Sequence, residues 1–385
     1  MTEREPEPVH GAEPDTEFEA LPSTWEEQAV SLADAFISPR EPTGEEHRIL
    51  TRFAHLCLRF AHMEHRIQGD VLFDVSAHPA VIRGDHDENL LTGAEELAAA
   101  EREILEIPEG PIDDLSELLD DRGIKIIEWT QPPGNDPSGA FLFDGNTGPA
   151  LLALAPEGSP AGRLILAHEY CHLIADVDPY ENRFCPAASQ EEAGTKGGGR
   201  LFEPDRPDGG DRRLIRSEIR ADLFARAFLL PAEHFLRSLR LFEIRPEHDL
   251  ALPRVADLAL YYGVEPAVVL GRLVDLGILP PEEVRSITVE PRVLPGSGPP
   301  DAPPPAGPAD FRSDRPERFV NLGLAMFLKH LVSLDQLATL LGIDRDTARQ
   351  FLAWCDLPPS IAKAAKGADP PETPETGRPE SRGTR

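Results

Sequence analysis

The sequence predicts an α+β fold that is mainly helical, with a small β-sheet and with helix-turn-helix-like units beside the core. Apolar residues recur at helical spacing over much of the chain, as at Ile49 and Phe53. Residues 123–154 instead carry short apolar or β-branched runs separated by turn-forming residues. Two later stretches each combine a helical pattern, a turn glycine (Gly263 or Gly342) and a second helical pattern. These patterns predict helices arranged around one small sheet.

The charge balance and the cysteine content restrict the class of protein. The chain of 385 residues has 68 acidic and 38 basic side chains, a formal net charge of -30. This acidic excess argues against non-specific binding to nucleic acid or to an anionic membrane. The amino terminus lacks the features of a signal peptide, and no apolar run has the length of a membrane span. Four cysteines without a C-x-x-C pair fit a reducing compartment, so we expect a cytoplasmic protein.

Changes in composition divide the chain into seven segments. A capping-box pattern at Thr43 and Glu46 marks a helix start in the amino-terminal part. The stretch "PGSGPPDAPPPAGPAD" has the composition of a stiff linker. We expect an acidic disordered tail over 1–22, a helical region over 23–109, a core over 110–235, a helix-turn-helix-like unit over 236–287, a Pro-rich linker over 288–317, a small helical unit over 318–358 and a disordered tail over 359–385.

Within the expected core, the strands come directly before one unusual helix. "GIKIIEW" predicts a strand, and "GAFLF", "DGNTG" and "ALLALA" predict a hairpin or two neighbouring strands. The next segment, "LILAHEYCHLIADV", places His168 and His172 four residues apart, with Glu169 directly after the first histidine. On a helix both imidazoles project from one face. The H-E-x-x-H pattern is a zinc signature in which the glutamate acts as general base.

A simpler interpretation competes with a metal site at these histidines, and a second histidine cluster must also be considered. The pair could be core histidines that bond to backbone groups, and a third ligand is needed to decide. A second candidate cluster, formed by His55, Cys57, His62 and His65, lies on the helix predicted after Thr43. We interpret that cluster as an ordinary polar helix face that carries histidines, and not as a metal site.

A third ligand is available on the helix "RSEIRADLFARAFLLP". Glu218 and Asp222 are four residues apart and share one helical face. Glu218 would complete a two-histidine, one-glutamate set that leaves the fourth position of a tetrahedral zinc open, as in catalytic sites. Asp222 would hold the distal nitrogen of one ligand histidine. Alternatively, both carboxylates pair with Arg216 or Arg220 on the solvated face of the helix.

Asp178 is a competing third ligand. It lies six residues after His172, where H-E-x-x-H-x-x-G-x-x-[HD] enzymes place theirs. Those enzymes need a glycine for the sharp turn between the two ligands, and this chain has Ala175 there. We therefore favour Glu218.

Taken together, "SGAFLF", "RLILAHEYCHLI" and "SEIRADLFARAFLLP" resemble the ImmA/IrrE family of metallopeptidases. That family pairs an H-E-x-x-H helix with a later E-x-x-A-[ND]-x-F-A helix that ends in a Leu-Leu-x-Pro-like segment. The resemblance spans about 110–280, less than half of the chain. The residues that match the later helix are Glu218, Ala221, Asp222, Phe224, Ala225, Leu229, Leu230 and Pro231.

Two features depart from the family pattern. Cys171 stands where the family usually has glycine, and we expect it to pack as a small residue. The gap from His172 to Glu218 is longer than usual because of the Gly- and Pro-rich segment 185–211. This insertion affects the expected shape of the cleft and leaves the ligand assignment unchanged.

The resemblance implies a zincin-like peptidase core that binds one zinc ion through His168, His172 and Glu218. In such a site the metal polarises the peptide carbonyl and activates water, and Glu169 transfers the proton to the leaving amine. An extended substrate would add to the edge of "GAFLF" or "ALLALA". Candidate donors to the oxyanion are His234 and Tyr170.

The resemblance also implies a role in regulation, in which the enzyme inactivates a partner helix-turn-helix repressor and so derepresses its operon. The alternative is a non-catalytic regulator that binds DNA or protein and keeps a vestigial zinc site. The two helix-turn-helix-like units support this alternative, but their second helices offer few basic side chains, such as Arg272, Arg345 and Arg349. We therefore expect no direct binding to nucleic acid. Residues 23–109 leave room for a sensing function that the sequence does not define.

Overall fold

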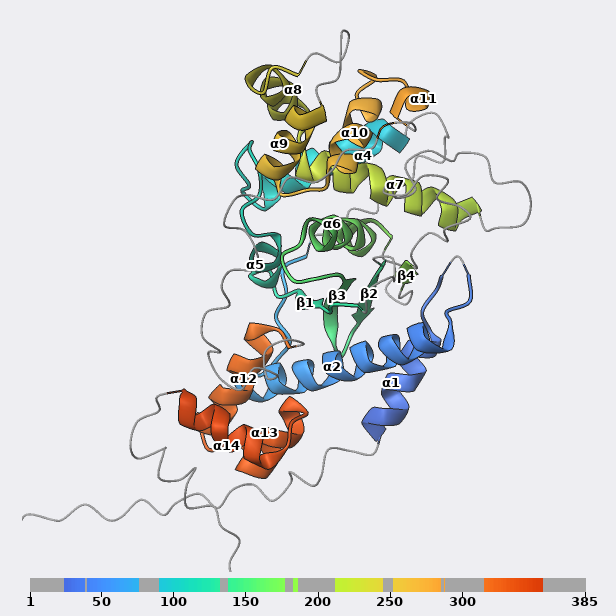
Figure 1. The fold of residues 1–385 in the computed structure, drawn as a ribbon. Coiled ribbons are helices and arrows are strands. Elements are labelled where there is room, and N and C mark those ends of the chain that lie inside the picture. Colours follow the sequence, from blue (N-terminus) through green and yellow to red (C-terminus); the bar gives the residue numbers. More distant parts are fainter. Residues whose placement is uncertain are drawn as a thin grey trace, which may run out of the picture.

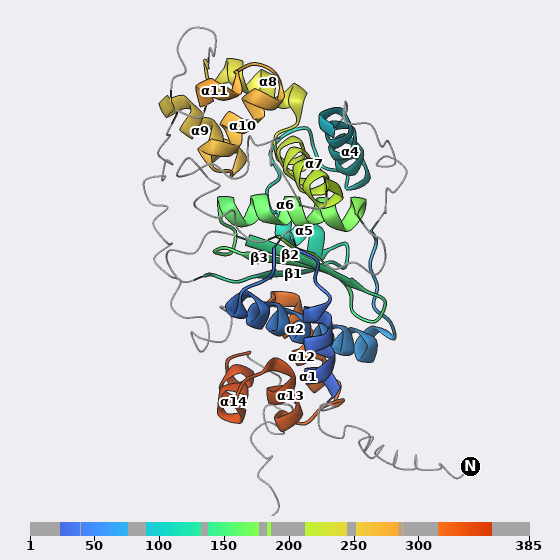
Figure 2. The ribbon, with the colours of Figure 1, turned by 90° about the vertical axis from the view of Figure 1, so that its right-hand side faces the viewer.

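The protein forms a layered α+β structure in which one small sheet lies between two helical layers (Figures 1 and 2). This computed structural model describes residues 24–38, 40–75, 90–131, 138–176, 183–185, 212–244, 252–284, 287 and 315–355. The expectation of a mainly helical α+β fold with a small sheet is confirmed at this level. The expected tails and most of the expected linker lie outside the described residues.

The sheet has four strands in the order β1-β3-β2-β4. Strand β1 pairs with β3 in parallel, and β2 runs antiparallel to both β3 and β4. The predicted hairpin is confirmed as β2 and β3, joined by a tight turn that ends at Gly148, whose φ is +67°. The bounds are β1 Lys125–Glu128, β2 Ser138–Asp144, β3 Gly148–Leu154 and β4 Arg183–Cys185.

The two faces of the sheet belong to two separate hydrophobic clusters. In β3, which is buried along its length, Leu151 and Ala153 join one cluster and Ala150 and Leu152 join the other. This alternation follows from the two-residue period of a strand. Because both faces are covered, the strands read as continuous apolar runs.

One face of the sheet is covered by a group of helices around α6, which packs directly on β2 and β3 (Figure 2). Helix α7 lies across α6 and contacts α4 and α10. The bounds in this group are α4 Leu90–Ile104, α5 Leu115–Asp120, α6 Pro160–Ala175, α7 Arg212–Leu229, α8 Ala232–Leu241, α9 Leu252–Tyr262, α10 Pro266–Asp275 and α11 Pro281–Val284.

The opposite face is covered jointly by the first and the last helices of the described chain (Figure 1). Helix α2 lies against the sheet and packs on both α1 and α12. Its predicted capping box at Thr43 and Glu46 is confirmed. Residues of the 23–109 range therefore lie on both faces, since α4 belongs to the other layer. The bounds are α1 Thr24–Asp34, α2 Gly44–Gln68, α12 Glu317–Leu328, α13 Leu334–Leu341 and α14 Arg345–Trp354.

A buried charge network joins these amino- and carboxy-terminal helices to the sheet. Lys125 of β1 is fully buried, and its Nζ lies 2.7 Å from a carboxylate oxygen of Glu64 on α2. Arg318 of α12 donates to the other oxygen of Glu64 at 2.9 Å and pairs with Asp120 of α5 at 3.1 Å. Burial is the main cause that lowers the pKa of Lys125, against the raising effect of Glu64. The network joins α12 to α2 directly through Arg318 and Glu64, and the buried Lys125 joins the same Glu64 to β1.

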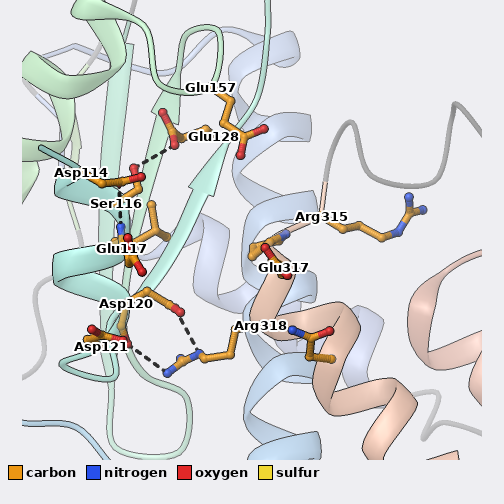
Figure 3. A pocket seen from close by; sticks show the side chains of 13 residues that line it. Asp114, Ser116, Glu117, Asp120, Asp121, Glu128, Glu157, Arg315, Glu317 and Arg318 are labelled. Carbon is orange, nitrogen blue, oxygen red and sulfur yellow. Dashed lines mark hydrogen bonds and ion pairs between the residues drawn. The ribbon is translucent and has the colours of Figure 1, made fainter. Parts of the chain in front are cut away.

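Beside this network, α5 and the first turn of α12 border an acidic cavity of about 620 Å³ (Figure 3). Ser116 donates to Glu128 within it, and burial raises the pKa of both Glu128 and Asp120. The cavity is lined by neither the H-E-x-x-H residues nor Glu218, so it is separate from the site described next. Its acidic lining residues are Asp114, Glu117, Asp120, Asp121, Glu128, Glu157 and Glu317.

Candidate metal centre

Helix α6 begins where the sequence provides a strong start signal. The Ser159 side chain accepts a hydrogen bond from the Gly162 N–H, and Pro160 occupies the first helical turn. From there the helix runs between the sheet and α7 (Figure 2). A helix covered on opposite sides is apolar around most of its surface, so its buried polar residues stand out. They are Glu169 and His172, and His168 beside them is only slightly exposed.

The two histidines of α6 and the glutamate of α7 converge on one point. The Nε2 atoms of His168 and His172 are 3.1 Å apart. The two carboxylate oxygens of Glu218 lie 3.6 Å from these nitrogens, one oxygen to each ring. Within the described part of the chain, this is the one group of three or more metal-ligating side chains close enough to share an ion, with all donor atoms inside 4.8 Å. The predicted ligands are therefore brought together by two helices far apart in sequence.

This donor set fits a divalent metal ion. Two imidazole nitrogens and one carboxylate form a typical three-ligand set of catalytic zinc sites, which keep one position open. The three side chains are also largely removed from solvent, at 13% exposure for His168, 0% for His172 and 7% for Glu218. Without a positive charge between them, a buried carboxylate facing two imidazole nitrogens would be costly. The group could hold a metal ion.

Each histidine is oriented by a carboxylate on its other nitrogen. Asp222 Oδ1 lies 2.8 Å from His168 Nδ1, which is the place expected for it from the sequence. Asp176 Oδ2 lies 2.6 Å from His172 Nδ1. When Nδ1 donates to a carboxylate, Nε2 keeps its lone pair and can bind a metal. Both imidazoles are therefore held in the tautomer that a metal needs.

Asp176 and Arg220 are site residues that the sequence interpretation missed. Asp176 directly follows α6 as its C-cap residue, and Arg220 of α7 donates to the carboxylate oxygen that His172 does not use. The sequence does indicate a contact between Asp176 and His172, because Asp176 lies four residues after His172, the spacing of neighbours on one helical face. The sequence alone suggests Arg220 only as a partner of Glu218 or Asp222. It instead links the end of α6 to α7.

The two histidines of this group carry opposite pKa shifts. Burial lowers the pKa of the His168 imidazole, but hydrogen bonds and negative charge from Asp222 and Glu218 outweigh it and raise that pKa well above 6.5. Burial also acts on His172, and there it prevails over Asp176 and Glu218, so its pKa is lowered. One proton therefore resides mainly on His168. A metal ion that binds here must displace it.

Glu169 lies directly against strand β2. Its side chain is fully buried, and an added Cβ on Gly139 would come within 2.4 Å of its Oε1. Two residues further along β2, the ring of Phe141 stacks on His172 at a centroid distance of 6.0 Å. Residues two apart on a strand share a face, so Gly139 and Phe141 both underlie the metal centre. Only glycine at position 139 lets α6 approach this closely.

The remaining candidate residues contact other groups or lie outside the described residues. Tyr170 donates its hydroxyl to Glu101 of α4, and burial raises its pKa. His234 bonds the hydroxyl of Tyr262 at 2.7 Å and stacks on Tyr261. These contacts engage Tyr170 with α4 and His234 with α9, and the role of either as oxyanion donor stays a prediction. The competing ligand Asp178 lies outside the described residues.

The unusual cysteine and the second histidine cluster have structural explanations. Cys171 is fully buried in the core, and burial raises the pKa of its thiol, so it packs there as a protonated small residue. On α2, Cys57 is also fully buried, with a pKa raised by burial to about 12. His62 packs edge-on against Trp25, and His55 lies 3.2 Å from an Arg59 nitrogen. These α2 residues do not converge on a metal position.

Comparison with known proteins adds no assignment. No family model, no curated protein and no solved structure matches this chain. Function must therefore be inferred from the residues of the centre and from the sequence motifs.

Proposed function

We propose that this protein is a zinc-dependent endopeptidase of the ImmA/IrrE type that cleaves a partner helix-turn-helix repressor. The observation that carries the proposal is the convergence of His168, His172 and Glu218 beside the buried carboxylate of Glu169. The choice of zinc rests on this donor set and on the H-E-x-x-H motif. The repressor as substrate and the cytoplasmic location rest on the sequence resemblance and on composition.

The proposed chemistry assigns separate tasks to the metal and to the protein. When bound, zinc would supply Lewis acidity toward a peptide carbonyl and lower the pKa of water. Glu169 would accept a proton from the attacking water and donate it to the leaving amine. Its contact with Gly139 restricts the carboxylate to the side of the centre that faces β2. Asp222 and Asp176 would keep the two imidazoles in place during turnover.

Metal analysis combined with a cleavage assay tests this proposal. The purified protein should contain about one zinc per chain. Glu218→Ala should lose it, whereas Asp178→Ala should retain it. Glu169→Gln preserves shape but cannot accept a proton, so it should keep zinc and lose cleavage of a cognate repressor. The reverse result for Glu218 and Asp178 would refute the ligand set, and a fully active Glu169→Gln would refute the catalytic role.

The alternative function is a non-catalytic regulator that binds DNA or protein. In the first helix-turn-helix pair, α10 is mostly buried, and the guanidinium of Arg272 is fully buried against Glu95 and the Leu230 carbonyl. That helix offers no basic edge to a DNA groove. In the second pair, the two arginines of α14 already pair with Asp335 and Asp346.

Phosphate binding is also disfavoured at the start of α14. Its amino terminus is capped by Asp344, whose negative charge occupies the place where a phosphate would bind. A filter-binding titration against duplex DNA at low salt separates the two functions. We expect no saturable binding, and specific binding would favour the regulator.

Within the described residues, no helix is long and apolar enough to cross a membrane.

A further inference from the structure

The strand beneath the metal centre has its outer edge already paired with another segment of the same chain. Gly139, Ala140 and Phe141 of β2 pair antiparallel with Cys185, Phe184 and Arg183 of β4. The other edge of β2 pairs with β3, and β3 lies between β1 and β2. The expectation that "ALLALA" offers a free edge is therefore wrong, because that segment is the interior strand β3. The edge of "GAFLF" exists, and β4 occupies it at residues 139–141.

The occupied part of β2 is also the part nearest to the catalytic candidates. Gly139 lies under Glu169 and Phe141 lies under His172. An extended peptide that adds to a sheet edge is held by main-chain hydrogen bonds to that edge. A substrate held beside Glu169 would need the backbone groups of residues 139–141. Those are the residues that pair with β4.

We propose that residues 183–185 occupy the substrate-backbone position of the metal centre, so that an extended substrate binds only after β4 leaves β2. This inference rests on the proposed peptidase function, and it names the regulation of that same site. The position fits an extended peptide that runs antiparallel to β2, as β4 does. A partner that captures the β4 segment, or a longer substrate strand, would open the site.

A strand of three residues is suited to such an exchange. It forms few ladder hydrogen bonds, and a longer incoming strand forms more. However, β4 begins only eight residues after the end of α6, at Arg183 compared with Ala175, so it competes from a high effective concentration. If the β4-free state is a minor state of ~1–10%, apparent substrate affinity falls to that fraction of its intrinsic value, a loss of about 10–100-fold.

A reversible disulfide between β2 and β4 provides the test. Ala140 and Phe184 are directly paired. Directly opposed antiparallel residues have Cα atoms about 4.5–5.5 Å apart, within the range that a disulfide spans. We therefore design Ala140→Cys/Phe184→Cys in a Cys185→Ser background, with Cys185→Ser alone as the control. The opposite perturbation is Arg183→Pro/Phe184→Pro, because one of two consecutive strand residues must donate its N–H to β2.

The readout is ligand binding to the zinc-loaded protein, measured by calorimetry. One probe is an extended peptide hydroxamate, which needs both the metal and the strand edge. The other is acetohydroxamate, which needs only the metal. The oxidised disulfide variant should bind the peptide hydroxamate at least about tenfold more weakly than the same protein after reduction. The double proline variant should bind it about tenfold or more tightly than wild type, while acetohydroxamate should bind all variants alike.

The outcomes separate this inference from the proposed function. Equal binding of the peptide hydroxamate before and after reduction would overturn the inference, even if the protein cleaves a repressor. A disulfide effect on binding in a protein that cleaves no repressor would support the inference and count against a repressor as the substrate. If the wild-type protein retains no zinc, or if it does not bind acetohydroxamate, both the inference and the proposed function are overturned. If the protein cleaves its own chain between residues 177 and 211, the inference is also overturned, because β4 would then be a substrate and not a block.

Discussion

Replacement of Gly139 by alanine tests whether Glu169 is held against β2. The added Cβ would lie 2.4 Å from Glu169 Oε1, 2.5 Å from Ile165 Cγ2 and 2.8 Å from Glu169 Cγ. Ordinary contacts begin at 3.4 Å, so the closest pair must separate by 3.4 − 2.4, or about 1 Å. The glutamate can move only by rotation away from β2 or by a shift of the whole of α6.

The magnitude follows from this displacement. Overpacking of a buried contact costs ~1–3 kcal/mol in the free energy of unfolding. A misplacement of ~1 Å at a reacting group costs ~100-fold in rate. The two ligand histidines face Glu218 of α7, and none of the three ligands is among the atoms nearest to an added Cβ at residue 139, so zinc content should remain at about one per chain. We therefore expect Gly139→Ala to bind zinc, to unfold at lower denaturant concentration, and to lose ~100-fold in kcat.

Denaturation curves, zinc analysis and cleavage rates of wild type and variant measure these effects. The matched control is Gly145→Ala in the turn after the same strand, where an added Cβ meets nothing within 4 Å, and which should change stability by less than ~0.5 kcal/mol. Addition of Glu169→Ala to Gly139→Ala removes two of the three close contacts, so the stability costs should not add. Unchanged stability and kcat in Gly139→Ala would refute the contact between Glu169 and β2.

Three further predictions concern the carboxylates around the centre, the proton on the metal-free site and the buried charge network. Asp222→Ala and Asp176→Ala should each weaken zinc binding by ~10–100-fold in competition with a chromophoric chelator, and wild-type affinity in either would contradict the orienting role. Because the folded pKa of His168 is raised above its usual 6.5, its proton stabilises the metal-free protein below about that pH, and this contribution disappears as pH rises through the folded pKa. Zinc affinity should consequently still increase above pH 7, by up to ~10-fold per unit, and a flat profile would exclude a protonated His168. Glu64→Ala leaves a buried lysine without its counter-charge and should cost ~3–5 kcal/mol in urea denaturation, whereas Glu45→Ala, with its side chain 60% exposed on the same helix, should cost almost nothing.

The parts of this molecule that the sequence predicted are those fixed by local geometry. A helix with histidines four residues apart must present both on one face, and the apolar runs around a turn signal favour a hairpin or two neighbouring strands, here β2 and β3. The pairing of α6 with α7 is not local. It was expected because the helix containing Glu218 resembles a family motif, since the hydrophobic pattern of α7 says only that one face is buried.

The parts that could not be predicted depend on contacts between distant segments. Strand β4 has three residues and too short a pattern to be recognised as a strand. The apolar stripe of α2 predicted a buried face, but not that α12 would share the cluster beneath it. Lys125 lay within a predicted strand, and its burial depends on Glu64 and Arg318, which lie far from it in sequence. Charged residues that are buried in pairs cannot be recognised until both partners are placed.

The contacts across α6 and α7 explain why a long insertion between the ligands need not disturb the centre. Each helix orients a group on the other, because Asp222 of α7 holds His168 and Arg220 of α7 holds the carboxylate of Asp176 that orients His172. Behind these polar contacts, Tyr170 of α6 packs on two stacked phenylalanines of α7. The distance between His172 and Glu218 is therefore set by packing of two helices and not by the chain that connects them. For the same reason, the connecting segment can vary in length and can place a strand on β2 while the three donor atoms stay together.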